Sequence, residues 1–219
     1  MIEAKKAKGA APAAAKERAA PYHHGSLHEA LIKAAEDILR TEGLQGLTLR
    51  AAARAAGVSH AAPTNHFGDI RGLLSELAAV GFVRFHDALE AKAKGAATPA
   101  ERGLAFGEAY VEFATAQPDL FLLMFRGERL DLERPALKAA IDASFVQLAQ
   151  SADRRPNPAS VLDLDQAAQI AGAWSLVHGF AMLMIDGRLK PLLQRTGPGV
   201  DEMTLLRSML RQPRGQTGG

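Results

Sequence analysis

Apolar residues recur every three or four positions along most of this chain, and they hardly ever alternate one by one with polar residues. Near the N-terminus, one such run follows Ser26 and ends at Gly43, and the next follows Thr48 and ends at Gly57. Serine and threonine cap helix N-termini with their hydroxyl oxygens, while glycine adopts the left-handed backbone that ends many helices. The pattern therefore predicts an all-α protein that opens with two capped helices.

The same spacing continues through the rest of the chain. Ser59 is expected to cap a short helix over 60–67, and Asp69 to cap a long apolar helix over 70–91. Five more helices are expected over about 98–117, 119–125, 132–152, 164–186 and 200–210. Thr98 and Asp163 are expected to cap the first and the fourth of these. These nine helices predict a three-helix head at 22–69 and a larger C-terminal domain at 70–211.

The two ends of the chain differ in composition from the rest. Residues 1–21 have no large apolar side chain after Ile2 and carry several lysines, so we expect a disordered basic arm. Such an arm either solubilises the protein or follows DNA phosphates and the minor groove. The glycine-rich residues 212–219 are expected to form a disordered tail.

The composition favours a globular protein of the cytoplasm. Hydrophobic residues make up 47% of the 219 residues, enough to form a core, and the absence of cysteine fits a reducing compartment. The start does not resemble a signal peptide. The longest apolar stretch, 173–185, is shorter than the roughly 20 residues of a membrane-spanning helix. We therefore expect a buried helix there and no membrane association.

Residues 48–67, TLRAAARAAGVSHAAPTNHF, have the layout of a DNA-reading helix-turn-helix. Ala52, Ala53 and Ala56 would let the two short helices approach closely, and Val58 would fill the corner between them. The second helix could then project into a major groove. A slight excess of basic residues over 1–71 permits DNA binding, although a helix-turn-helix can also serve packing alone.

The second helix of this motif carries side chains suited to base edges and phosphates. Asparagine pairs with adenine through two hydrogen bonds, and threonine and histidine bond to bases or phosphates. Ser59 would add a phosphate site at the helix N-terminus. The side chains expected to face DNA are His60, Ala61, Thr64, Asn65 and His66.

Several motifs, in this order, resemble the TetR family of regulators. Those that resemble its N-terminal domain are Tyr22-His-His-Gly25-Ser-Leu27, Glu42-Gly43, Thr48-Leu-Arg50, Ala55-Ala-Gly57-Val-Ser59 and His66-Phe67-Gly-Asp69. Two others, Pro118-Asp-Leu-Phe-Leu-Leu-Met124-Phe125 and Trp174-Ser-Leu-Val-His178-Gly179, resemble the C-terminal domain of the subgroup named for its Trp-His-Gly signature. The resemblance covers about 22–210.

The resemblance implies a transcriptional regulator, most often a repressor, that binds a palindromic operator in double-stranded DNA as a homodimer. Helices 164–186 and 200–210 would join the two copies, and a small-molecule effector would enter the C-terminal domain and shift helix 70–91. Thr48 and Arg50 would join the DNA contacts. The chain departs from the family at Thr64, usually tyrosine, and at Ile70, often lysine, so we expect Arg71 to replace that lysine at the phosphates.

Aromatic and apolar side chains of the C-terminal domain are the candidate effector contacts. Trp174 and His178 are one helical turn apart and should point together into this domain, either toward a ligand or simply into the core. The other candidates are Phe106, Tyr110, Phe113, Met124, Phe125 and Phe145. They favour a largely apolar ligand with few polar anchors.

Enzymatic and metal sites are not expected. His23, His24 and His28 lie close in sequence but lack a neighbouring cysteine or carboxylate cluster beyond Glu29, so we expect no metal and no cofactor. The sequence Gly57-Val-Ser59-His-Ala61 lacks the last glycine of a nucleophile elbow, and no phosphate-binding loop is present. A DNA-compacting protein remains an alternative, and it would bind DNA without sequence preference and with a steep salt dependence.

Overall fold

The computed structural model of the chain describes residues 24–151 and 162–211, and every regular element in these ranges is a helix. The predicted all-α class is therefore confirmed. The predicted arm at 1–21, the tail at 212–219 and the side chains of His23 and His24 lie outside the described residues. The described part contains ten α-helices and one short 3-10 helix, where the sequence predicts nine helices.

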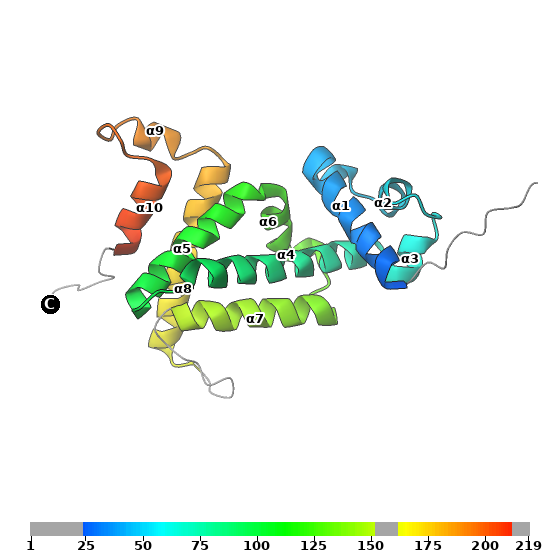
Figure 1. The fold of residues 1–219 in the computed structure, drawn as a ribbon, viewed down its shortest axis with the longest axis horizontal. Helices are drawn as coiled ribbons and strands as arrows, with labels where there is room; N and C mark the ends of the chain where they lie inside the picture. Colours follow the sequence, from blue (N-terminus) through cyan, green and yellow to red (C-terminus); the bar gives the residue numbers. More distant parts are fainter. Residues whose placement is uncertain (1–23, 152–161, 212–219) are drawn as a thin grey trace, which may run out of the picture.

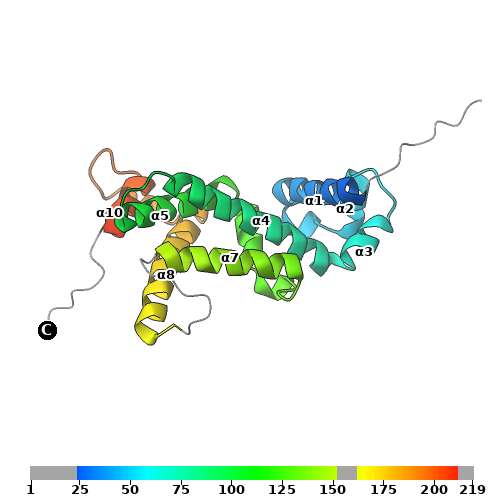
Figure 2. The same ribbon diagram turned by 60° about the horizontal axis from the view of Figure 1, so that its bottom comes forward.

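Three helices form the head at one end of the molecule, and a long helix leads from it into the C-terminal bundle (Figure 1). The helices of this first half are α1 (His24–Gly46), α2 (Leu49–Ala55), α3 (Ala62–Phe67) and α4 (Ile70–Ala93). The bundle contains α5 (Pro99–Ala116), α6 (Pro118–Met124), η1 (Gly127–Arg129), α7 (Pro135–Ser151), α8 (Leu164–Ile185), α9 (Lys190–Leu193) and α10 (Glu202–Arg211). Figure 2 shows α7 lying along α4, with α8 steeply inclined to α7 at one of its ends.

Most predicted helix caps are present. Thr48 accepts a hydrogen bond from the amide of Ala51 at 3.1 Å, and Asp69 accepts one from the amide of Gly72 at 2.8 Å. Reciprocal capping boxes open α5 at Thr98 and α8 at Asp163. These bonds satisfy amides that the first turn of a helix leaves without a partner.

Two predicted caps are wrong. Ser26 lies inside α1, which begins two residues earlier. Ser59 does not cap α3, because this helix begins at Ala62 after a turn in which the amide of Ala62 bonds to the carbonyl of Ser59 at 3.0 Å. Pro63 occupies the first turn of α3, where its missing N–H costs nothing, and this position fixes the late start.

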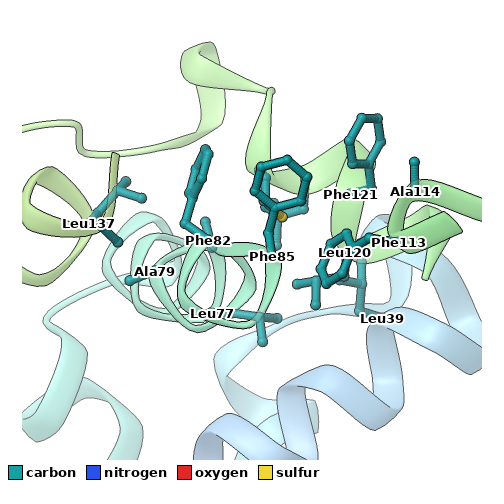
Figure 3. Close-up of a cluster of buried hydrophobic side chains, with 14 of the residues drawn as sticks. Leu39, Leu77, Ala79, Phe82, Phe85, Phe113, Ala114, Leu120, Phe121 and Leu137 are labelled. Carbon is teal, nitrogen blue, oxygen red and sulfur yellow. The ribbon is translucent and has the colours of Figure 1, made fainter. Parts of the chain in front are cut away.

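One continuous hydrophobic core runs from the head into the bundle. Leu39 of α1, Leu77 and Phe85 of α4 and Leu120 of α6 are all buried in it. Figure 3 shows side chains of α1, α4, α5, α6 and α7 gathered around α4. The predicted domain boundary between 69 and 70 falls where α4 begins, yet the core crosses it. A displacement of α4 would therefore act on both parts.

Helix α8 is not the buried helix that the sequence predicts. It packs one face against α5 with Ile170, Val177 and Phe180, and most of its other residues are exposed. Leu183, for example, is 41% exposed. By length and composition α8 is the one described helix apolar enough to cross a membrane, a criterion that helices of soluble proteins also meet. Apolar surface exposed in this way is typical of an interaction site.

Candidate DNA-binding surface and ligand cavity

Helix α3 presents its predicted reading face to solvent. Of the side chains expected on the second helix, Thr64 and Asn65 are exposed on α3, whereas His60 and Ala61 are exposed in the turn before it, because α3 begins only at Ala62. Pro63 and Phe67 are buried against the head. The polar side of this short helix is thus exposed to solvent, and its apolar side is buried. This arrangement is what a helix needs in order to enter a major groove as a rigid unit.

His66 and Ser59 flank this face differently from the other residues. The ring of His66 is half-buried and lies 6.3 Å from the ring of His28 in α1, centroid to centroid. Ser59 is exposed in the turn before α3. His66 therefore packs partly within the head, and Ser59 stays available at its surface.

The predicted phosphate contacts also separate into two kinds. Arg50 on α2 is exposed, and the hydroxyl of Thr48 serves as the α2 cap. Arg71 donates from Nη2 to the carbonyl oxygen of Leu130 at 2.6 Å, so it holds the segment between α6 and α7 against α4. Its expected contact with phosphate stays a prediction, but the structure gives Arg71 an additional role inside the protein.

A cavity of about 1070 Å³ lies between α4, α5, α7 and α8. Six of the eight predicted effector contacts line it, namely Phe106, Tyr110, Met124, Phe125, Phe145 and Trp174. The other two do not. Phe113 is buried in the core with its ring 5.3 Å from that of Phe85, and His178 is bonded to Tyr110 but does not line the cavity. Cavities that bind drug-sized ligands commonly enclose about 300–1,000 Å³, so this one has ample room.

Three polar side chains form a hydrogen-bonded chain at the cavity wall. Trp174 donates from Nε1 to Oη of Tyr110 at 3.2 Å, and this oxygen lies 2.8 Å from Nδ1 of His178. Burial raises the pKa of Tyr110 well above its usual value, and burial lowers the pKa of His178. Both groups are therefore uncharged near neutral pH.

A polar cluster, formed by Ser75, Glu76 and Arg134, connects the bundle to the head. Arg134 donates from Nε to Oε1 of Glu76 at 2.6 Å and from Nη1 to the carbonyl oxygen of Phe67, at the end of α3, at 3.4 Å. The fully buried Ser75 accepts a hydrogen bond from the amide of Asp131 at 2.8 Å. The cluster thus ties the segment 126–134 to α3 and α4.

Sequence reasoning missed this cluster, although a signal existed. Ser75 and Glu76 are polar residues within the long apolar run of α4, and buried polar side chains require partners. The same segment also reaches the cavity, because Gly127 and Leu132 line it. One short stretch of chain therefore touches both the cavity and the reading helix.

Within 24–151 and 162–211, no group of three or more His, Asp or Glu side chains could hold a metal ion. Of the histidines that the sequence draws together, the structure describes only the side chain of His28. That side chain lies 3.9 Å from Glu76. The expected absence of a metal stays a prediction.

Two family models match the chain. The model of the tetR family of bacterial regulatory proteins matches residues 31–77, and that of the tetracyclin repressor-like C-terminal domain matches residues 104–206. No protein with a curated functional description matches the chain significantly.

Solved structures share the fold over most of the chain. A protein of unknown function from Rhodococcus sp. RHA1 is 33% identical, with a TM-score of 0.70 over 87% of this chain and 94% of its own. The TetR family transcriptional regulator PfmR from Thermus thermophilus is 21% identical, with a TM-score of 0.55 over 82% and 94%. AibR, in a complex with isovaleryl coenzyme A and operator DNA, is 15% identical, with a TM-score of 0.54 over 84% and 96%.

Proposed function

Because this chain belongs to the TetR family of DNA-binding transcriptional regulators, we propose that it is a homodimeric repressor whose palindromic operator is released when a largely apolar molecule fills the cavity. The observation that carries this proposal is the continuity between the outward face of α3 and the aromatic cavity. Both are attached to α4 and to the segment 126–134. We also propose that the protein has no enzymatic activity of its own.

The reading of DNA is assigned to α3. Its exposed Asn65 and Thr64 can address base edges, while Arg50 and Ser59 can hold phosphates on either side. Two copies related by a two-fold axis would present two such helices to half-sites about one helical turn apart. A palindrome follows from that symmetry.

The exposed face of α8 supports the proposed dimer. Leu164 and Leu183 are large apolar residues exposed on this helix, and a second copy of α8 would cover such residues. We therefore propose a cytoplasmic protein in which another copy, and not lipid, covers this helix. From the sequence, helix 200–210 is expected to join the two copies. Its Leu206 is instead fully buried within its own chain, where α10 packs against α5, so this side chain is not proposed as a dimer contact.

Leu183→Glu tests this interface. A charge placed on an otherwise apolar interface costs several kcal/mol when it has no partner, so the variant should be monomeric in sedimentation experiments. Val83→Glu is the matched control, because Val83 is similarly exposed but lies on α4. A dimeric Leu183→Glu protein, or a Val83→Glu monomer, would contradict the placement.

Release of DNA is proposed to follow from the two attachments of the segment 126–134. A ligand that displaces Gly127 or Leu132 would move Arg134 and the carbonyl of Leu130, and so shift α3 and the start of α4. The ligand needs only to bind the displaced arrangement more tightly than the operator-bound one. The Trp174–Tyr110–His178 chain at the cavity wall supports placing the protein in the Trp-His-Gly subgroup.

Selection of bound sequences from random double-stranded DNA, at a stated salt concentration near physiological, tests the proposed function. An inverted repeat is the expected result and would supply the probe for ligand screening. Binding without an enriched motif, and with a steep salt dependence, would instead support a DNA-compacting protein. A single unrepeated half-site would contradict the dimeric reader.

A further inference from the structure

The polar atoms of the cavity wall are unequally divided between donors and acceptors. Trp174 N–H is already donated to Tyr110, and Ser144 donates its hydroxyl hydrogen to the carbonyl of Ala140 at 2.9 Å. An indole nitrogen can only donate, so Oη of Tyr110 must be the acceptor in the first of these bonds. Two hydrogens of the wall are therefore not offered to a ligand.

The hydrogen of Tyr110 is committed as well. Burial lowers the pKa of His178, so its ring is neutral and carries one hydrogen. We assign that hydrogen to Nε2, because Tyr110 then donates to Nδ1 at 2.8 Å and each hydrogen of Trp174 and Tyr110 has an acceptor. A hydrogen on Nδ1 would instead be donated to Oη, and the hydroxyl hydrogen of Tyr110 would lose Nδ1 as its acceptor. This arrangement leaves the second lone pair of Oη on Tyr110, together with Oγ of Ser144, to face a ligand. The uncharged side chains of the wall therefore still offer hydrogen-bond acceptors and no donor.

Charged groups are confined to one end of the cavity. Glu101 and Arg211 are the charged residues of the lining, and both are exposed. The carboxylate of Glu101 already accepts from the amides of Ala97 and Thr98 at 2.7 and 3.2 Å. The guanidinium of Arg102 lies 4.6 Å from the centre of the Phe106 ring, but it is paired with Glu90 and does not line the cavity. No charged side chain lines the aromatic part around Tyr110, so an ion placed there would lose its hydration without a partner.

We propose that the cavity selects uncharged molecules with an apolar body and a hydrogen-bond donor, such as alcohols or phenols, and that Oη of Tyr110 accepts this donor. The inference rests on the proposed function insofar as the cavity is taken as the effector site. It adds the chemical class of the ligand, which shape and apolar lining alone leave undefined.

The chain provides its own probe for this proposal, because Trp174 is its only tryptophan and lines the cavity. Its fluorescence can be titrated with four compounds that share one apolar ring: cyclooctanol, its methyl ether, cyclooctanecarboxylate and cyclooctylammonium. The ether keeps an acceptor but has no donor. Cyclooctanol should bind about threefold to tenfold more tightly than the ether, because one neutral hydrogen bond separates them. Both ions should bind at least tenfold more weakly than the alcohol.

Two variants test whether Oη of Tyr110 causes the preference for cyclooctanol over its ether. Tyr110→Phe keeps the ring and removes Oη, so the preference for cyclooctanol over the ether should fall to about one. Ser144→Ala removes the other acceptor and should leave most of the preference in place. Equal binding of alcohol and ether by the unaltered protein, tighter binding of either ion, or a preference that survives Tyr110→Phe would each overturn the proposal.

Failure of this inference and failure of the proposed function give different results. If cyclooctanol binds as expected but leaves operator affinity unchanged at saturation, the ligand class stands and release by the cavity fails. If the ions bind best and also release the operator, the proposed function stands and the ligand class is wrong.

Discussion

Arg134 and Glu76 form an ion pair that joins the residue before α7 to the second turn of α4, with Nε 2.6 Å from Oε1. The two side chains are only 22% and 19% exposed, so solvent screens the pair less than it would a surface pair. Arg134 also reaches the carbonyl of Phe67 at the end of α3. Arg134 therefore connects the segment 126–134 to α3.

Arg134→Met should loosen this connection while keeping a long apolar stem. We expect the free energy of unfolding to fall by about 1–2 kcal/mol, less than for a fully buried pair because both groups retain some solvent. Amide hydrogen exchange should accelerate in the segment 126–134 and at the junction of α3 and α4, since both lose their shared partner.

Arg84→Met is the matched control for this prediction. Arg84 pairs with Glu36 through both nitrogens of its fork, and this pair joins α4 to α1 without touching the segment 126–134. Its loss should speed exchange near that pair only. If both variants change exchange at the same amides, Arg134 does not specifically connect the segment 126–134 to α3 and α4.

Asn65→Ala and Arg50→Ala should weaken DNA binding in different ways. The asparagine is expected to read a base edge, so its loss should cost about 1–3 kcal/mol on the selected operator and almost nothing on random DNA. The arginine is expected to contact phosphate, so its loss should weaken both and reduce the salt dependence by about one ion. Fluorescence anisotropy on both DNAs at several salt concentrations measures this. An equal loss on both DNAs for Asn65→Ala would remove its assignment as a base contact.

The helix caps could be predicted from sequence because each depends on neighbours in the chain. Thr48, Asp69 and Thr98 each bond to an amide three residues away, and the residue types alone indicate such a bond. Ser59 is a residue type that often caps helices, but it lies too far from α3 to cap it. Pro63 occupies the first turn of α3, so this helix begins only at Ala62. Residues close in sequence therefore determine whether each of these helix caps forms.

The remaining features depend on the tertiary structure. Arg134 and Glu76 are 58 residues apart, and nothing near either residue indicates its partner. The aromatic residues of the C-terminal domain could be named as candidates, but only the packing of α5 separates Phe113 in the core from Phe106 at the cavity. The exposure of α8 was missed because an apolar composition is the same for a core and for an interface.

Gly72 occupies a position where α4 passes very close to the end of α3. A Cβ there would overlap the carbonyl oxygen of Phe67 and lie 2.9 Å from Nη1 of Arg134. Because backbone cannot move aside as a flexible side chain does, Gly72→Ala should lower the free energy of unfolding by about 1–3 kcal/mol. It should also weaken operator binding by displacing α3.

Chemical denaturation and anisotropy on the operator measure these two effects. Gly197→Ala is the control, since a Cβ there meets open space and should change stability by no more than about 0.5 kcal/mol. A Gly72→Ala protein as stable as the control would mean that the contact between α3 and α4 adjusts freely.

His178 should make the stability of the protein depend on pH. Burial lowers the pKa of this histidine in the folded chain, so the unfolded chain, with a value near 6.5, takes up the proton first. The stability that the neutral ring provides is thus complete above about pH 6.5 and is lost as the pH falls below it. Protonation also turns Nδ1 into a donor, so that Tyr110 loses its acceptor.

His178→Gln keeps an amide oxygen that can accept from Tyr110 but cannot titrate. Denaturation measured between about pH 7.5 and 5 should therefore show a steeper loss of stability for the unaltered protein than for the variant. The other histidines are present in both proteins, so the difference between the two curves isolates His178. Trp174 fluorescence should change over the same range in the unaltered protein only, because its indole bonds to the same Tyr110 oxygen. Parallel curves would mean that solvent reaches the ring well enough to keep it at its ordinary pKa.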